Sequence, residues 1–192
     1  MTRRALISLY DKSGLVDFAR SLVQFGWELI ASGGTALAIR KANLPVQDVA
    51  DITGSPEILG GRVKTLHPAI HGGILARNSA SDKADLAGQK IKVFDLVACN
   101  LYPFQETVAR HDVSLEEAVE QIDIGGVTLL RAAAKNFNRV IVISDPSDYE
   151  WVLNGIKQGS INLAERRMLA SKAFVHTRDY DTAIVNYLEE LS

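Results

Sequence analysis

The sequence is short of the features that mark extracellular, membrane-spanning and nucleic-acid-binding proteins. It has one cysteine in 192 residues, Cys99, so no disulfide can form within the chain, and a cytoplasmic location is expected. The apolar run after Arg3-Arg4 is too short for a signal peptide, and no other run reaches the length of a membrane span. The formal net charge of -2 provides no field that would attract nucleic acid or an anionic membrane. Any anion-binding site must therefore be local.

The composition is that of an ordinary globular protein, with 47% apolar and 23% charged residues and no low-complexity tract or internal repeat. Short apolar runs alternate with amphipathic patterns, which predicts an α/β fold with a parallel sheet covered by helices on both faces. Strands are expected at residues 5–10, 28–31, 46–49, 94–99 and 139–143. Helices are expected at 15–25, 36–42, 79–90, 114–122, 129–135, 146–153 and 163–188.

Several polar residues are expected to cap these helices. Thr35 is a plausible N-cap for the helix after the second strand. Ser55 is expected to cap a short helix whose first residue is Pro56. Ser114 and Glu117 have the spacing of a capping box, in which each side chain accepts a hydrogen bond from the other residue's backbone amide.

Two polar turns, residues 11–13 and 32–35, follow predicted strands and precede predicted helices. Parallel sheets bind ligands outside the carboxyl ends of their strands, and the amides at a helix start attract phosphate. A single Ser-Gly-Gly-Thr turn is a weak signal, because most such turns are only turns. Two polar turns at the same edge of one sheet are stronger support for a phosphate site.

The stretch from Gly60 to Gly73 contains two cations, two histidines, a hydroxyl and a glycine pair at each end. It has no amphipathic period, and Pro68 is expected to keep a helix from running through it. Arg62, Lys64 and Thr65 offer charged and neutral donors that suit an anion such as phosphate. The alternative is a solvated basic loop with structural glycines.

Asp123 and Lys135 stand at the two ends of an alanine-rich helical segment. In ordinary roles, Asp123 caps the amides that follow it and Lys135 complements the helix dipole. On one straight helix they would lie roughly 18 Å apart, at about 1.5 Å per residue. They could share a site only if Gly125-Gly126 fold the chain back, and the sequence leaves this open.

The chain resembles inosine monophosphate (IMP) cyclohydrolase, the N-terminal domain of the bifunctional purine-biosynthesis protein PurH, along essentially its whole length. The resemblance rests on residues 11–14, 32–35, 61–68, 100–104 and 122–136. It implies a methylglyoxal-synthase-like Rossmann variant over residues 1–160, a three-layer α/β/α fold with a mostly parallel sheet. Residues 161–192 resemble the helical connection to a formyltransferase domain that this sequence does not contain.

The resemblance implies ring closure of 5-formamidoimidazole-4-carboxamide ribonucleotide (FAICAR) to IMP with loss of water, the last step of de novo purine biosynthesis. By the same resemblance, the residues that carry the chemistry are Lys64, Tyr102, Asp123 and Lys135. Those that hold the nucleotide are Tyr10, Asp11, Lys12, Ser32, Gly33, Gly34, Thr35, Arg62, Thr65, Cys99, Asn100, Ile124, Gly125 and Gly126. No cofactor is implied, and no metal is expected at His67 and His71, because Pro68 lies between them and a third ligand is lacking.

These residue types suit the reaction. We expect Asp123 and Lys135 to form the base that takes a proton from the carboxamide nitrogen, with a neutral Lys135 as acceptor and Asp123 orienting it. A charged Lys135 would instead donate a proton to the departing hydroxyl. Lys64 and the amides of residues 124–126 are expected to stabilise the negative charge on the formyl oxygen, with Tyr102 donating to the same oxygen or orienting the carboxamide.

Two other functions remain as alternatives. Methylglyoxal synthase has a related fold, but its catalytic aspartate motif is not found here and the basic loop is foreign to it. A non-catalytic nucleotide sensor would explain the phosphate turns but not the four residues assigned to chemistry. The family further implies a homodimer, and fusion to a formyltransferase domain in the full-length protein.

Overall fold

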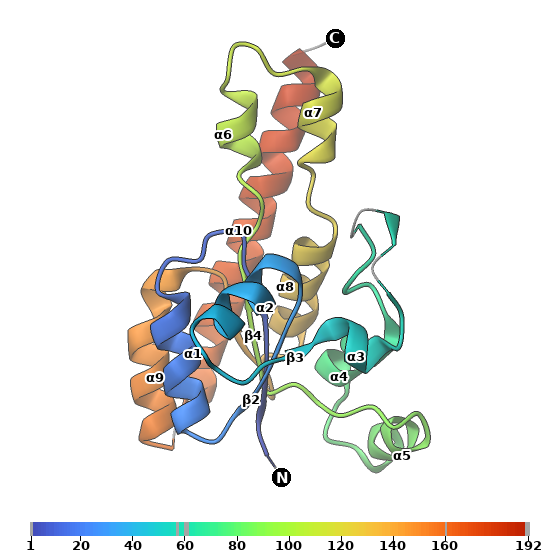
Figure 1. The fold of residues 1–192 in the computed structure, drawn as a ribbon, viewed down its shortest axis with the longest axis vertical. Helices are drawn as coiled ribbons and strands as arrows, with labels where there is room; N and C mark the ends of the chain where they lie inside the picture. Colours follow the sequence, from blue (N-terminus) through green and yellow to red (C-terminus); the bar gives the residue numbers. More distant parts are fainter. Residues whose placement is uncertain (1, 57, 60–61, 160, 191–192) are drawn as a thin grey trace.

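A sheet of five parallel strands forms the centre of the computed structural model, which describes residues 2–56, 58–59, 62–159 and 161–190 (Figure 1). The strands stand in the order β3-β2-β1-β4-β5. Their bounds are β1 Arg4–Ser8, β2 Glu28–Ala31, β3 Gln47–Asp48, β4 Leu96–Cys99 and β5 Ile141–Ile143. All five lie within the predicted strands or overlap them, so the predicted parallel α/β sheet is confirmed.

The central strands are largely apolar because helices bury both faces of the sheet, whereas the two-residue edge strand β3 is polar. β1 is the central strand, and Ala5 pairs with Leu29 of β2 on one side and with Leu96 of β4 on the other. α1 and α9 pack together on one face, where the rings of Phe18 and Tyr149 stack at 4.2 Å. α8 and α4 cover the opposite face (Figure 1).

The helices between the strands agree with the predicted alternation. Their bounds are α1 Leu15–Gln24, α2 Gly33–Lys41, α3 Val49–Thr53, α4 Pro68–Leu75, α5 Ala80–Gly88, α6 Phe104–Val108, α7 Leu115–Glu120, α8 Gly125–Lys135, α9 Tyr149–Lys157 and α10 Leu163–Glu190, with a 3-10 turn at Pro146–Asp148. The capping box of Ser114 and Glu117 at the start of α7 is confirmed.

α10 is a 28-residue helix that packs along α8 and β5 and continues past the carboxyl edge of the sheet. There its upper half is covered by α6 and α7 (Figure 1). The predicted domain boundary at residues 160 and 161 stays a prediction. Of the helices in the described ranges, none is long and apolar enough to cross a membrane.

Two predictions about helix ends were wrong, and one helix was not predicted. Thr35 lies inside α2 rather than before it, because its hydroxyl is bonded to Leu9 just after β1 and Ser32 occupies the cap position. No helix runs through Pro68, as expected, but Pro68 begins the unpredicted helix α4, since proline is well suited to a first helical turn, and Nδ1 of His67 accepts a hydrogen bond from the Ala69 amide there. Ser55 caps no helix at Pro56: residues 55, 56 and 58 are not helical. Glu57, Gly60 and Gly61 lie outside the described residues.

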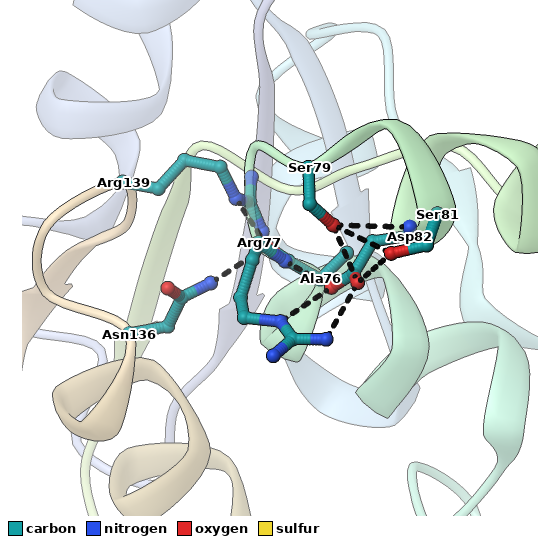
Figure 2. Close-up of polar contacts among 7 residues, drawn as sticks. All are labelled: Ala76, Arg77, Ser79, Ser81, Asp82, Asn136 and Arg139. Carbon is teal, nitrogen blue, oxygen red and sulfur yellow. Dashed lines mark hydrogen bonds and ion pairs between the residues drawn. The ribbon is translucent and has the colours of Figure 1, made fainter.

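The last carbonyl groups of α4 accept hydrogen bonds from side chains that follow α8. Asn136 Nδ2 donates to the carbonyl of Ile74. Asn136 Nδ2 and Arg139 Nε both donate to the carbonyl of Ala76, the latter at 2.9 Å (Figure 2). Arg77 lies beside them and forms a two-pronged ion pair with Asp82 at the start of α5 (Figure 2). These contacts fix α4, and with it the loop of residues 62–67 that reaches the sheet edge.

Candidate functional site

The start of α2 is flanked by two lysines. Ser32 is extended and precedes the helix, and Gly33 has a φ of +53°, a conformation that L side chains rarely adopt. A Cβ placed on Gly33 would lie 2.7 Å from Lys64 Nζ, and one placed on Gly34 would lie 3.6 Å from Lys12 Nζ. Two ammonium groups therefore stand beside the backbone amides of a helix start. This arrangement suits a phosphate group.

The side chains of Thr35 and Asn100 hold the loops of the site together. Thr35 Oγ1 is buried, accepts a hydrogen bond from the Leu9 amide at 2.9 Å and donates to the Leu9 carbonyl at 3.1 Å. Asn100 Oδ1 accepts from the amides of Tyr10 and Asp11, at 2.7 and 3.1 Å. Both residues were expected to contact the nucleotide. In the structure their polar atoms position the loops after β1 and β4.

Tyr10 and Tyr102 form a half-exposed aromatic wall at the carboxyl edge of the sheet. Their rings meet edge to face, with centroids 5.4 Å apart. Lys12 Nζ donates to the Tyr10 carbonyl at 3.0 Å, and Asp11 accepts two hydrogen bonds from Ser13. This wall lines a cleft of about 1020 Å³ whose other side is formed by α10 and the loop after β5.

Asp123 lies at the same edge, in the short link before α8. Its Oδ1 accepts a hydrogen bond from the Gly126 amide at 2.7 Å, and the Tyr102 amide also donates to the carboxylate. Burial raises the pKa of Asp123, and these two hydrogen bonds only partly oppose the rise. A Cβ on Gly125 would lie 3.1 Å from Thr65 Oγ1, so the loop that carries Lys64 reaches the start of α8. A partly buried carboxylate thus stands close to the phosphate-type cradle.

Gly126, the second glycine of the pair before Val127, leaves room for the Asp123 carboxylate because it has no side chain. A Cβ on Gly126 would lie 2.5 Å from Asp123 Oδ2 and 2.8 Å from the Leu101 side chain, which no real structure tolerates. Because the Gly126 amide is bonded to Asp123, it is not available to stabilise an oxyanion, contrary to the prediction. Ile124 is exposed at the position just before the helix.

Two other predicted contact residues have different surroundings in the structure. Cys99 is only 1% exposed, and its thiol lies 3.7 Å from the Gly126 carbonyl beneath the site. Burial and the nearby Asp123 raise the pKa of Cys99 well above its ordinary value, so the thiol is a neutral part of the core. Arg62 forms an ion pair with Glu120 of α7 instead of facing the cradle.

Lys135 does not lie at this edge of the sheet. α8 is one unbroken helix from Gly125 to Lys135, which places Lys135 about 18 Å from Asp123 at about 1.5 Å per residue. The glycine pair does not fold the chain back, so the predicted pairing of Asp123 with Lys135 does not occur within one chain. Lys135 instead lines a groove of about 700 Å³ between α8 and α10.

Sequence reasoning assigned no role at the site to Tyr180. Its hydroxyl, on α10, accepts a hydrogen bond from the Asp123 amide at 2.8 Å. No local signal could have revealed it, because the two residues are 57 positions apart. Among the described residues no group of three or more His, Cys, Asp or Glu side chains could hold a metal ion.

Comparisons with known proteins agree with this geometry. The family model described as MGS-like domain matches residues 14–128, and the one described as AICARFT/IMPCHase bienzyme matches residues 133–192. The bifunctional purine biosynthesis protein PurH of Chloroflexus aurantiacus is 55% identical over 96% of this chain and 36% of its own length. PurH of Trichormus variabilis is 56% identical over 98% of this chain and 38% of its own length.

A solved structure is similar along the whole fold. The crystal structure of ForH superposes with a TM-score of 0.86 and 37% identity, covering 96% of this chain and 98% of that one. This chain therefore spans little more than a third of the length of the two PurH relatives, but almost all of the ForH chain.

Proposed function

Because this chain belongs to the MGS-like domain family and matches PurH proteins along almost its whole length, we propose that it is an IMP cyclohydrolase. It would close the ring of FAICAR to give IMP and water. The observation that carries the proposal is the placement of Asp123, a partly buried carboxylate with a raised pKa at the same sheet edge as a two-lysine cradle.

The cradle supports binding of the nucleotide's 5′-phosphate. Two cations and the amides at the start of α2 would neutralise its charge, and the positive φ of Gly33 lets the backbone approach closely. The aromatic wall of Tyr10 and Tyr102 would then cover the ribose and the imidazole ring. Anchoring the phosphate in this way would direct the carboxamide and formamide groups toward Asp123.

Ring closure needs one base and one oxyanion stabiliser. The carboxamide nitrogen attacks the formyl carbon, a carbon–nitrogen bond forms, and the nitrogen loses a proton to Asp123. The proton on Asp123 passes to the formyl oxygen, which becomes a hydroxyl group, and this hydroxyl leaves as water together with a second proton lost from a ring nitrogen. A carboxylate with a raised pKa suits both accepting and returning a proton.

Tyr102 is the best placed donor for the formyl oxygen, since its backbone contacts Asp123 and its ring lines the cleft. One good donor of this kind contributes about 3–4 kcal/mol. Lys64 lies at Gly33 in this structure, which supports a role in phosphate binding; its predicted role in the chemistry stays a prediction. Nucleophile and electrophile belong to one molecule, so the reaction as written balances without a cofactor.

The assignment also bears on the longer relatives. Both PurH proteins are named bifunctional and extend well beyond the region that this chain matches. We assign ring closure to this region and formyl transfer to the remainder of such a protein. The reaction belongs to the class of hydrolases that act on cyclic amidines. The buried free thiol of Cys99 suits a reducing cytoplasm as the location of the protein.

The direct test is to mix FAICAR with the wild-type chain and follow IMP formation by absorbance. Rapid closure by the wild type supports the proposal, provided that Asp123→Asn still binds IMP but does not accelerate closure. A folded wild-type chain that binds IMP tightly without accelerating closure would contradict it and favour a nucleotide sensor.

The position of Lys135 leads to a second part of the proposal. The groove that holds it has four basic residues and, among the described residues lining it, no acidic one: Arg131, Lys135, Arg167 and Arg178. Phe137 and Phe174 give it an apolar floor. A groove with this composition suits a partner surface that is both acidic and apolar.

The chain itself carries such a surface next to the site. α7 exposes Leu115 and Val119 one helical turn apart and carries the acidic Glu116 and Glu117 in its first turn, and Ile124 is exposed just after Asp123. We infer that the chain forms a homodimer in which this surface of α7 and Ile124 docks into the groove of a second copy. Lys135 of that copy would then approach Asp123, which Lys135 of the same chain cannot do.

Mixing two variants tests this dimer. Asp123→Asn and Lys135→Ala are each expected to be inactive alone. Mixed dimers should recover up to about a quarter of wild-type activity, because about half of the dimers are mixed and each of these has one intact site. No recovery, in a mixture shown to exchange subunits, would contradict a role for Lys135 across the interface. Full activity of Lys135→Ala alone would return Lys135 to the role of a helix-end cation.

A further inference from the structure

Tyr180 of α10 is bonded to the backbone that carries the carboxylate of the site. Its hydroxyl accepts a hydrogen bond from the Asp123 amide at 2.8 Å and donates one to the Gln121 carbonyl at 2.9 Å. The side chain is buried, with Tyr180 only 8% exposed. Burial raises the pKa of Tyr180 to about 12, so the hydroxyl keeps its proton and can donate throughout the neutral range.

The segment held by this hydroxyl is a short non-helical link. α7 ends at Glu120 and α8 begins at Gly125, so residues 121–124 carry Asp123 between two helices. One hydroxyl bonds both to the beginning of this link and to Asp123 itself. The amides of Gln121 and Ile122 bond back to the end of α7, whereas the Asp123 amide and the Gln121 carbonyl bond to Tyr180, so α10 fixes the part of the link that carries the carboxylate.

Three elements therefore fix Asp123 from three directions. The loop after β4 provides the Tyr102 amide, and the first turn of α8 provides the Gly126 amide; both donate to the carboxylate. α10 provides the Tyr180 hydroxyl, which holds the main chain instead of the carboxylate. Of these three contacts, only that of Tyr180 comes from α10, the helix that follows the last strand of the sheet in the chain.

The ring of Tyr180 is itself held in place. It meets the buried ring of Phe104 edge to face, at 6.2 Å between centroids. Tyr187, two turns further along α10, meets the same Phe104 ring at 5.8 Å. The two tyrosines share a helix and an aromatic neighbour, but the hydroxyl that bonds the Asp123 link is that of Tyr180.

We propose that Tyr180 is a positioning residue for Asp123 and that α10 is for this reason part of the cyclohydrolase site. The inference rests on the proposed function. Tyr180 does not touch the reacting atoms; it sets the position of the base relative to the substrate held at the start of α2. A base displaced by a fraction of an ångström loses much of its effect, because proton transfer requires close approach and alignment.

The test compares Tyr180→Phe with wild type, and Tyr187→Phe serves as the matched control. Removing the hydroxyl leaves the ring on Phe104 but releases the Asp123 amide and the Gln121 carbonyl. We expect kcat for FAICAR closure to fall about tenfold in Tyr180→Phe. KM and the Kd for IMP should stay within about twofold, since the phosphate cradle is untouched. Tyr187→Phe should behave as wild type.

A second readout separates positioning from a general loss of stability. A looser link admits water to Asp123, which reduces the burial that raises its pKa. The acid limb of kcat against pH should therefore move to lower pH in Tyr180→Phe, with rates expressed per IMP-binding site so that unfolded protein is not counted. The limb of Tyr187→Phe should stay where the wild type has it.

The outcomes are distinguishable. If the wild type closes FAICAR but Tyr180→Phe has the same kcat and the same acid limb, the positioning role is wrong and the proposed function stands. The same holds if Tyr187→Phe loses as much activity as Tyr180→Phe. If the wild type binds IMP but does not close FAICAR, the proposed function fails, and the positioning role fails with it.

Discussion

At the start of α8 the Asp123 carboxylate is partly buried, and no cation among the described residues of this chain offsets that burial, whereas just beyond the end of α8 the partly buried Arg139 is matched with acceptors. Arg139 donates to the carbonyls of Gly73, Ile74, Ala76 and Phe94, at 2.7–2.9 Å. The hydrogen bonds of the Arg139 guanidinium connect the end of α4 with Phe94, just before β4. The Asp123 carboxylate, by contrast, remains available to react.

The pKa directions express the same difference. Burial raises the pKa of Asp123, so the site destabilises its own ionised base and makes it a better proton acceptor. Burial also lowers the pKa of Arg139, but an arginine remains charged at any working pH, and here each prong of its guanidinium has a carbonyl partner. A reactive group, Asp123, thus lies just before α8, and a structural cation, Arg139, lies just after it.

Asp123→Asn should produce the largest effect. It keeps the size of the side chain but removes the base, so kcat should fall by about 10²–10⁴-fold. The free energy of unfolding at neutral pH should not fall much, because a buried charge is removed with the carboxylate. Steady-state kinetics and urea unfolding would measure both. Asp85→Asn, at an exposed position on α5, is the control, and an equal loss there would contradict the account.

Arg139→Met should show the opposite pattern, a large loss of stability with little change in chemistry. Four carbonyl groups would lose a partly buried donor, and the free energy of unfolding should fall by about 3–5 kcal/mol. Urea denaturation would measure this, with kcat expressed per folded molecule. Arg77→Met removes an exposed arginine from the same neighbourhood (Figure 2) and should cost less than about 1 kcal/mol. Similar losses of stability in the two variants would show that Arg139 contributes no more to stability than an exposed arginine does.

Gly126→Ala should impair the site at Asp123 by steric clash alone. The added methyl group would meet Asp123 Oδ2 and Leu101, and relieving that contact displaces the carboxylate. We expect a stability cost of about 1–3 kcal/mol and at least a tenfold loss of kcat. Gly88→Ala, where a Cβ meets nothing within 4 Å, should leave kcat unchanged. A fully active Gly126→Ala would mean that the position of Asp123 is not critical.

The smallest effect should come from a solvated carboxylate on the far side of the cleft. Lys172 lies 2.9 Å from Asp145 and lowers the pKa of that carboxyl to about 2. Because the folded pKa is below the unfolded one, this pair stabilises the protein above about pH 4 and loses its contribution as pH falls toward 2. Asp145→Asn removes this pair while Lys172 keeps its contact with Asp148, and it should cost less than about 1 kcal/mol at pH 6, since Lys172 and Asp145 are well exposed, and almost nothing near pH 2. A difference that persists at pH 2 would contradict the ion-pair explanation.

The sequence was a good guide to features whose cause is local. Apolar runs predicted β1, β2, β4 and β5, because parallel strands are buried on both faces, whereas the polar edge strand β3 was predicted from its position after Pro45. The capping box at Ser114 and Glu117 depends on four adjacent residues and was confirmed. Lys12, Lys64 and the turn at residues 32–35 were predicted to share a site, and the structure brings them together.

Features that depend on distant partners could not be read from the sequence. Thr35 looked like a helix cap, but its hydroxyl bonds to Leu9, 26 residues away. Arg62 looked like a phosphate ligand, yet Glu120 of α7 pairs with it. The separation of Asp123 from Lys135 depended on whether two glycines would break a helix, and the packing of α8 against the sheet kept it straight.

The rate of FAICAR closure as a function of pH tests most directly whether Asp123 is the reactive group at the start of α8. Single-turnover rates should rise with pH through a pKa above the ordinary aspartate value and level off once Asp123 is ionised. Asp123→Asn should be slow at every pH and should lack this limb. A wild-type rate that does not change with pH, or the same limb in Asp123→Asn, would contradict the account.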